Sequence, residues 1–160
     1  MKEIQLTKGR IAIVDDDMYE ILSKNKWSMG TYYAYRKEKI DGKIKNVFMQ
    51  HKVVGFAPKG FVVDHINRNK LDNRKENLRF ATASQNKQNS KVRKDCVSGH
   101  KGITFVKDDR YNKKWKVVIK NMQKNKVELV GYYMDLNDAI NAYKKRNLEL
   151  NGCYSPYYTI

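Results

Sequence analysis

The chain has few cysteines, prolines and histidines, and this scarcity limits the kinds of site it can carry. Its 160 residues include two cysteines and two prolines. Cys96 and Cys153 lie far apart, and His51, His65 and His100 are scattered. A structural zinc site needs about four Cys or His ligands in paired spacing. We therefore expect no structural zinc and, in a reducing cytosol, no disulfide.

Long hydrophobic runs are also missing. The sequence has no run of about 18 apolar residues, which a transmembrane helix requires, and residues 1–5 lack the apolar region of a secretory signal. A hydrophobic content of 41% suffices for modest cores. We expect a soluble, cytoplasmic protein with no membrane partner and no small-molecule cofactor.

Acidic residues are outnumbered by basic ones. Thirty-three Lys and Arg stand against 17 Asp and Glu, which gives a formal net charge of +16. Residues 87–126 alone hold 13 basic and three acidic residues, a local net charge of +10. Such a charge is typical of a protein that binds a polyanion. Since these basic residues fall on expected loops and strands rather than on an amphipathic helix, nucleic acid is favoured over a membrane surface.

The first third of the chain predicts short strands and helices. Apolar and polar residues alternate over residues 3–14, which indicates a hairpin. The acidic residues Asp15 to Asp17 favour a helix N-terminus rather than a metal site. That helix should carry Ile21 and Leu22 on its inward face. The remaining expected elements are strands over 31–37 and 43–48 and a short helical segment over 49–56.

The next segment predicts two strands followed by a helix. Phe61 to Val63 should form a buried strand that ends at Asp64, and residues 78–80 a second strand. Thr82 to Gln85 is a capping box that begins a helix carrying Asn86. A ββα unit built from these elements would bring Asp64 and Asn86 together, although 22 residues separate them.

The side chains of this segment suit metal-assisted hydrolysis. The oxygen donors of Asp64 and Asn86 are of the kind that Mg²⁺ or Mn²⁺ accepts. The ordinary pKa of His65 suits a proton acceptor near neutral pH. A lone histidine is usually structural, but Asp64, Asn77 and Asn86 beside His65 favour a catalytic site. On a polycationic protein, this combination indicates hydrolysis of a phosphodiester.

The pattern changes after residues 91–98, a polar stretch that predicts a linker. Strand-like runs occur over 103–106, 115–120 and 127–133. Asp135 then begins a long amphipathic helix. We expect a three-stranded sheet backed by one helix.

A long stretch of the central segment resembles the HNH endonucleases, and within them the phage-type homing endonucleases. The residues that carry the resemblance are Val63 to Arg79, Ala81, Thr82 and Asn86. The resemblance implies a ββα-metal fold in which His65 is the general base. It also implies that Asp64 and Asn86 hold one divalent metal, Mg²⁺ or Mn²⁺, and that Asn77 braces the loop and orients the base.

The C-terminal part resembles an AP2-type DNA-binding domain. The residues that carry this resemblance are Ser98 to Ile103, Lys114 to Val117, Val130 to Tyr133, Asp138, Ala139, Ala142 and Tyr143. In that fold the sheet lies in the major groove, which implies that Lys101, Thr104, Lys116 and Lys120 point toward DNA. The arginines with which that family reads DNA are largely missing, and lysine contacts phosphates more readily than it reads bases.

Further contacts to DNA are expected from basic residues near the core and the linker. These residues are Arg79, Lys87, Lys91 and Arg93. For Arg79, a surface salt bridge is an equal alternative to a phosphate contact. The affinity for DNA should fall steeply as the salt concentration rises.

These patterns together predict an α+β protein in four parts. They are an N-terminal β-rich segment of hairpins with a short helix (1–48), an HNH core (49–90), a linker (91–98) and an AP2-like domain (99–156). We expect a monomeric, metal-dependent homing-type endonuclease that nicks double-stranded DNA, with a dimer as one route to a double-strand break. The alternative is a non-catalytic, regulatory DNA-binding protein that uses the AP2-like domain. An RNA-directed protein is disfavoured because aromatic motifs for single-strand stacking are lacking.

Overall fold

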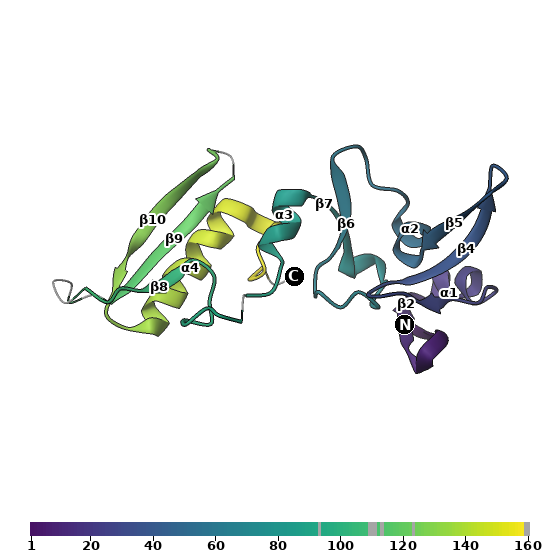
Figure 1. The fold of residues 1–160 in the computed structure, drawn as a ribbon, viewed down its shortest axis with the longest axis horizontal. Coiled ribbons are helices and arrows are strands. Elements are labelled where there is room, and N and C mark those ends of the chain that lie inside the picture. The colour runs from purple at the N-terminus through teal and green to yellow at the C-terminus, as the bar shows by residue number, and fades with distance from the viewer. Residues whose placement is uncertain (93, 109–111, 113, 123, 159–160) are drawn as a thin grey trace. The chain divides into compact units, whose positions relative to one another are not determined.

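The structure is a computed structural model that describes residues 1–92, 94–108, 112, 114–122 and 124–158. The chain forms two compact units, Met1–Asn86 and Lys87–Ile160 (Figure 1). Each unit has small sheets, short helices and a hydrophobic core of its own. The predicted α+β class is confirmed.

The first unit consists of small antiparallel sheets joined by short helices. β1 pairs with β2, β4 lies between β3 and β5, and β6 pairs with β7. These pairings confirm the predicted hairpins and the strand pair of the central segment. In chain order, the elements are β1 (Lys2–Gln5), η1 (Thr7–Gly9), β2 (Ile11–Val14), α1 (Asp16–Leu22), β3 (Ser28–Met29), β4 (Ala34–Ile40), β5 (Lys43–Phe48), α2 (Met49–Val54), β6 (Phe61–His65), η2 (Lys75–Asn77), β7 (Leu78–Thr82) and α3 (Ala83–Gln88).

One hydrophobic core joins the N-terminal elements to the central segment. Trp27 is buried in it, and the indole Nε1 donates a hydrogen bond of 2.8 Å to the carbonyl of Leu22. Met49 of α2 is fully buried in the same cluster, and Val53 and Leu71 pack against it. The segment that follows residue 48 is therefore stabilised by apolar side chains from the segment before it.

The inward face of α1 differs from the prediction in one residue. Met18 and Leu22 are buried, whereas Ile21 is 59% exposed. Residues four apart share a helix face, so Met18 and Leu22 form the buried side of α1. Tyr19, next to Met18, is partly buried and packs against the same core. Ile21 then falls on the solvent side. The prediction was right for Leu22 and wrong for Ile21.

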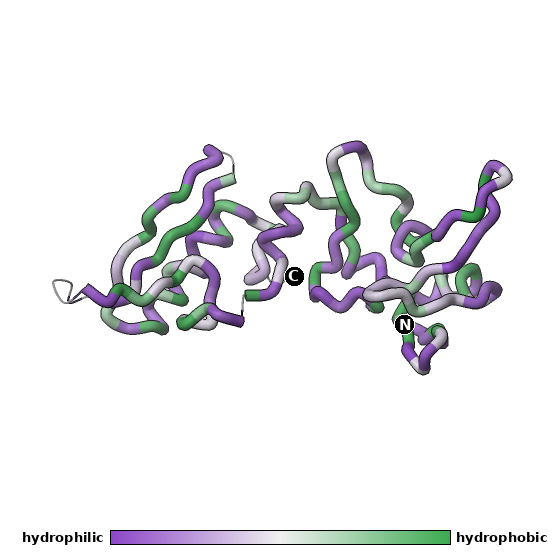
Figure 2. Tube along the Cα trace, viewed as in Figure 1, coloured by the Kyte–Doolittle hydropathy of each residue, from purple (hydrophilic) through white to green (hydrophobic). Residues whose placement is uncertain are grey.

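The burial of β6 also differs from the prediction. Val63 is buried, but Phe61 and Val62 are each 41% exposed. The burial of β6 therefore increases along the strand toward Asp64 and His65, and the prediction of a buried strand was wrong for Phe61 and Val62. Figure 2 shows this strand in the green of hydrophobic residues, beside the purple of the loop that follows it.

The second unit is a three-stranded antiparallel sheet with one helix against it. The sheet order is β10–β9–β8, and Ile103, Val117 and Ile119 pack with Ala139 and Tyr143 of the helix. The predicted sheet and helix are confirmed. The elements are β8 (Ile103–Phe105), β9 (Trp115–Asn121), β10 (Lys126–Tyr133), α4 (Leu136–Asn151) and η3 (Gly152–Tyr154).

The longest helix, α4, begins at the predicted residue. The Asp135 carboxylate accepts hydrogen bonds from the N–H groups of Asn137 and Asp138 at 2.7 and 3.2 Å. Such a cap satisfies N–H groups that have no partner inside the helix. In the part of the chain that the structure describes, no helix is long and apolar enough to cross a membrane.

Candidate active site

Asp64 and His65 occupy the end of β6, where the partner strand sets their neighbours. In the antiparallel register, Asp64 lies opposite Arg79 and His65 opposite Leu78. The side chains of Asp64 and His65 are buried, with 1% and 0% exposed. A carboxylate at this depth needs a compensating positive charge, since an isolated buried charge is strongly unfavourable.

Arg79 provides that charge. Its Nε and Nη2 donate hydrogen bonds to Oδ2 of Asp64 at 3.1 and 2.9 Å. The arginine itself is largely buried. Of the two alternatives for Arg79, the structure therefore shows the salt bridge, made to a buried carboxylate rather than on the surface.

The surroundings of His65 keep its ring neutral. Burial lowers the pKa of His65 to about 4, and the positive charge of Lys70 acts in the same direction. A hydrogen bond with Asn73 and the charges of Asp64 and Asp72 oppose this shift without cancelling it. At pH 7 the imidazole is therefore unprotonated, the state in which it can accept a proton.

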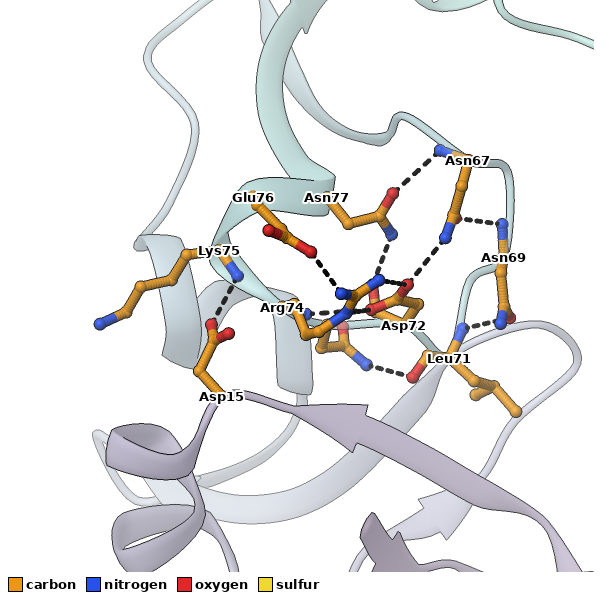
Figure 3. Close-up of polar contacts among 10 residues, drawn as sticks. Asp15, Asn67, Asn69, Leu71, Asp72, Arg74, Lys75, Glu76 and Asn77 are labelled. Atoms are coloured by element: carbon orange, nitrogen blue, oxygen red, sulfur yellow. Dashed lines mark hydrogen bonds and ion pairs between the residues drawn. The ribbon is translucent and has the colours of Figure 1, made fainter. Parts of the chain in front are cut away.

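The loop after β6 is held by side-chain hydrogen bonds (Figure 3). Oδ1 of Asn77 accepts a bond of 2.9 Å from the N–H of Asn67, and its Nδ2 donates a bond of 2.7 Å to the carbonyl of Asp72. The Asp72 carboxylate accepts bonds from Asn67 Nδ2 and from the guanidinium of Arg74. The Asn77 side chain thus links Asn67, two residues after His65, to Asp72 on the other side of the loop.

The N-terminal elements anchor the same loop from outside. The N–H of Ile13 donates to the carbonyl of Leu71, and the N–H of Asn73 donates to the carbonyl of Ile13, both at 2.8 Å. Asp15 occupies the N-cap position of α1 but makes no side-chain cap there. Its carboxylate accepts a hydrogen bond of 2.7 Å from the N–H of Lys75 instead (Figure 3). A residue predicted to serve only its own helix therefore holds the loop of the candidate site.

Asn86 lies on α3, which begins with the predicted capping box. The N–H of Thr82 donates to Gln85 Oε1 at 2.8 Å, and the N–H of Gln85 donates to Thr82 Oγ1 at 3.2 Å. Asn86 is half-buried one residue further on. The approach of Asn86 to Asp64 stays a prediction, because the strand register defines the neighbours of Asp64 on β7 but not those on α3.

Three residues near His65 were not among the predicted site residues. The ring of Tyr33 lies 5.9 Å from that of His65, and Lys70 Nζ lies 5.7 Å from the centre of the Tyr33 ring. Burial, and next the charge of Asp64, raise the pKa of Tyr33, so its hydroxyl keeps its proton. Asn73 is the third of them, because its side chain acts to raise the pKa of His65. Tyr33 precedes β4 and lies 32 residues before His65 in the sequence, so no local pattern indicates that the two rings meet.

The donors of the site fit a cation that prefers oxygen ligands. The Asp64 carboxylate is buried beside a positive group, Arg79, whose charge a bound cation would replace. Among the described residues, no group of three or more His, Cys, Asp or Glu side chains is placed to hold a metal. That a metal would bind Asp64 and the Asn86 carboxamide, with water or phosphate oxygens completing its ligands, stays a prediction.

The predicted DNA-contacting residues of the second unit divide into two groups. Thr104 lies opposite Lys116, on the sheet face away from the buried Val117 and Ile119. Lys120 is exposed on that same face, because side chains alternate along a strand. Lys101 differs from these three. Its Nζ donates to the carbonyls of Lys87 and Gln88 at 3.2 and 2.9 Å and to Ser90 Oγ at 2.9 Å.

The remaining basic residues lie where α3 ends and the linker begins. Lys87 and Lys91 are exposed. Arg93, also expected to contact DNA, lies outside the described residues. Their role in DNA binding stays a prediction.

Part of the first unit is similar to a known protein family. Residues 47–88 match the family model described as HNH endonuclease. These residues span α2, β6, the bonded loop, β7 and α3, so the candidate residues Asp64, His65, Asn77 and Asn86 all fall within the match. Over residues 47–88 the chain is therefore similar to an HNH endonuclease domain, as its resemblance to that family predicted.

Two viral proteins are similar to parts of the chain. An uncharacterized HNH endonuclease of Acanthamoeba polyphaga mimivirus is 34% identical over 109 residues, which cover 65% of this chain and 54% of that protein. Protein 3.8 of Escherichia phage T7 is 41% identical over 54 residues, covering 34% of this chain and 45% of the phage protein. The chain thus spans about half the length of each relative. No solved structure matches the chain.

Proposed function

We propose that this protein is a metal-dependent DNA endonuclease of homing type that nicks one strand of a duplex. The observation that carries the proposal is a neutral, buried imidazole, His65, next to the buried carboxylate of Asp64 within the HNH segment. A proton acceptor beside a carboxylate that can bind a cation is the pair that phosphodiester hydrolysis requires. The net charge of +16 favours a polyanionic substrate.

The reaction begins with water activated by His65. An unprotonated ring nitrogen of His65 accepts a proton from a water molecule, whose oxygen attacks the phosphorus in line with the leaving 3′ oxygen. The bond from phosphorus to that 3′ oxygen breaks, and the leaving oxygen takes a proton from solvent. A divalent cation held by Asp64 and Asn86 would supply charge stabilisation to the phosphate and the leaving oxygen.

Asn77 acts through the loop rather than on the substrate. Its side chain bonds the backbone of Asn67 and of Asp72, and its carbonyl accepts a bond of 2.9 Å from the N–H of Ile66. These bonds fix the chain immediately after His65. Asn77 is therefore a positioning residue for the base.

Arg79 is assigned two alternating partners. In the structure it compensates the charge of Asp64. A cation on Asp64 would repel the guanidinium, which would then be available to a DNA phosphate. Since His65 is fully buried, the attacking water can reach it only after a neighbouring group moves.

The second unit is assigned to duplex binding. The open face of its sheet carries Thr104, Lys116 and Lys120, opposite the face covered by α4. An AP2-like role for this face is supported by the strand and helix order and by the local charge. Lysines on an open sheet face can contact phosphates on both sides of a groove.

A plasmid assay tests the proposal. Supercoiled plasmid is incubated with the full chain in Mg²⁺ or Mn²⁺, with and without chelator. Conversion to the nicked circle that requires metal is the expected result. If the plasmid is retarded in a gel but stays intact with every divalent metal, the protein binds DNA without cleaving it. In that case the regulatory alternative holds.

A further inference from the structure

A pocket of about 380 Å³ in the first unit lies beside the candidate active site without being part of it. Five aromatic rings line it, those of Tyr33, Phe48, His51, Phe56 and Phe61, and residues 61–63 of β6 form one of its walls. Figure 1 shows the elements that supply these walls, β5, α2 and β6, close together in the first unit. Burial lowers the pKa of His51, so at pH 7 its ring is a neutral aromatic surface like the others.

The aromatic rings form a continuous path from His65 to solvent. Ring centres are 5.9 Å apart from His65 to Tyr33, from Tyr33 to Phe48 and from Phe48 to His51. The last step, from His51 to Phe56, is 5.0 Å. Phe56 is 75% exposed, so the path ends at an aromatic ring that packing within the chain does not cover.

The polar part of the pocket comes from one side chain. Gln50 lines the pocket and is 6% exposed. Within the part of the chain that the structure describes, its Oε1 is shielded from solvent and accepts no hydrogen bond. Buried amide oxygens normally have a donor. If the Gln50 amide turns toward the pocket, an amino group on the edge of a planar ring would supply one, and the aromatic walls would stack on the faces of that ring.

We infer that this pocket holds one unstacked nucleobase of the DNA strand that is cleaved, next to the scissile phosphate. This inference rests on the proposed function. Aromatic walls with one amide match the two surfaces of a base, its π-faces and its hydrogen-bonding edge. Strand β6 joins pocket and site, because residues 61–63 line the pocket and Asp64 follows.

Charge also favours a nucleotide over an apolar peptide. Lys70 lies over the ring of Tyr33 at the boundary between the pocket and His65. An ammonium group there can contact the phosphate of a nucleotide whose base enters the pocket. Unstacking one nucleotide would bend the backbone away from its duplex path and expose the adjoining phosphate to attack. The rival occupant is a second copy of this chain, covering Phe56.

Binding to matched DNA duplexes tests the inference. Three fluorescein-labelled duplexes share one sequence: one is fully paired, one has a single unpaired adenine, and one has an abasic residue at that position. Fluorescence anisotropy is measured with the full chain in chelator, so that no cleavage occurs. A bulged adenine is already unstacked, so it should bind about five-fold or more tightly than the abasic bulge. This is the lower end of what stacking one base on an aromatic side chain contributes.

Two variants of matched exposure complete the experiment. Phe56→Ala should abolish the preference for adenine over the abasic bulge. Ile44→Ala, which removes another large apolar side chain, 73% exposed on β5 of the same unit, should retain it. Equal affinity of the wild-type chain for the two bulges overturns the inference, and so does a preference that survives Phe56→Ala. A dimer that Phe56→Ala dissociates, without any base preference, overturns it in favour of self-association.

The plasmid assay separates this inference from the proposed function. If the wild-type chain nicks plasmid but shows no base preference, the pocket assignment alone fails. If it neither nicks plasmid nor binds any of the duplexes, the endonuclease proposal fails, and the pocket assignment fails with it.

Discussion

At the scale of single residues, charge compensation governs the candidate site. The Asp64 carboxylate is buried, and Arg79 is the cation that pairs with it. Removing one partner of a buried ion pair leaves the other charge uncompensated, which is costly. A metal ion on Asp64 would relieve that cost. Metal binding and the Asp64–Arg79 pair should therefore be coupled.

The variant Arg79→Met tests this coupling. We expect it to lower the stability of the metal-free protein by about 3 kcal/mol, the lower end for breaking a buried pair. Mn²⁺ should then stabilise the variant more than it stabilises the wild type, as measured by thermal unfolding in Mn²⁺ and in chelator. Arg36→Met, which removes the partner of Glu38 away from the site, is the control and should show no larger response to Mn²⁺. An Arg79→Met protein that gains no more from Mn²⁺ than the wild type would contradict the coupling.

The buried imidazole makes stability depend on pH. The pKa of His65 is about 4 in the folded protein and 6.5 in its ordinary state. Below pH 6.5 the unfolded chain binds a proton that the folded chain does not, so stability falls as the pH decreases from 6.5 toward 4. Between pH 7 and pH 5 the loss should be about 2 kcal/mol.

Urea unfolding of the full chain in chelator, at pH 7 and at pH 5, measures this loss in the free energy of unfolding. His65→Gln removes the titrating group, and its stability should change less between pH 7 and pH 5 than that of the wild type. His100→Gln, in the second unit, is the matched control and should keep the wild-type slope. Equal slopes for wild type and His65→Gln would show that His65 is not buried as a neutral ring.

At the scale of elements, the open face of the sheet in the second unit is the proposed DNA-binding surface. Lys120 is exposed on β9, whereas the ammonium of Lys101 already donates to the carbonyls of Lys87 and Gln88 and to Ser90. Lysines at the end of a helix stabilise its last carbonyls. Lys101 therefore serves the end of α3, and Lys120 is the more available phosphate contact.

The salt dependence of DNA binding distinguishes the two lysines. Lys120→Gln should reduce the slope of log K against log salt by about 1, the value for one phosphate contact. Lys101→Gln should change this slope less, although the charge removed is the same. Affinities measured across a salt series for both variants provide the comparison. A larger change for Lys101→Gln would place DNA on the α3 side of this unit instead.

At the scale of the whole molecule, the order of elements was predictable from the sequence and several contacts were not. Turn residues, the Thr82–Gln85 box and the Asp135 cap act over a few residues, so their positions carry the signal directly. The role of Asp15 depends on Lys75, sixty residues away. The contact between the rings of Tyr33 and His65 likewise joins residues that are far apart in the sequence. Such contacts come from packing between distant segments, which no local pattern encodes.

The proposed catalytic centre also determines which DNA product we expect. A single centre can cleave one strand at a time, so the nicked circle should accumulate before any linear plasmid. The central claim is that His65 is the base of this centre.

The most direct test is a single-turnover comparison of wild type and His65→Gln on supercoiled plasmid in Mg²⁺, with duplex affinity measured in parallel. We predict that His65→Gln loses nicking by a factor of about 100 or more, in the range for removing a general base, and binds duplex within a few-fold of wild type. Nicking at the wild-type rate by His65→Gln, or loss of duplex binding together with nicking, would contradict the account.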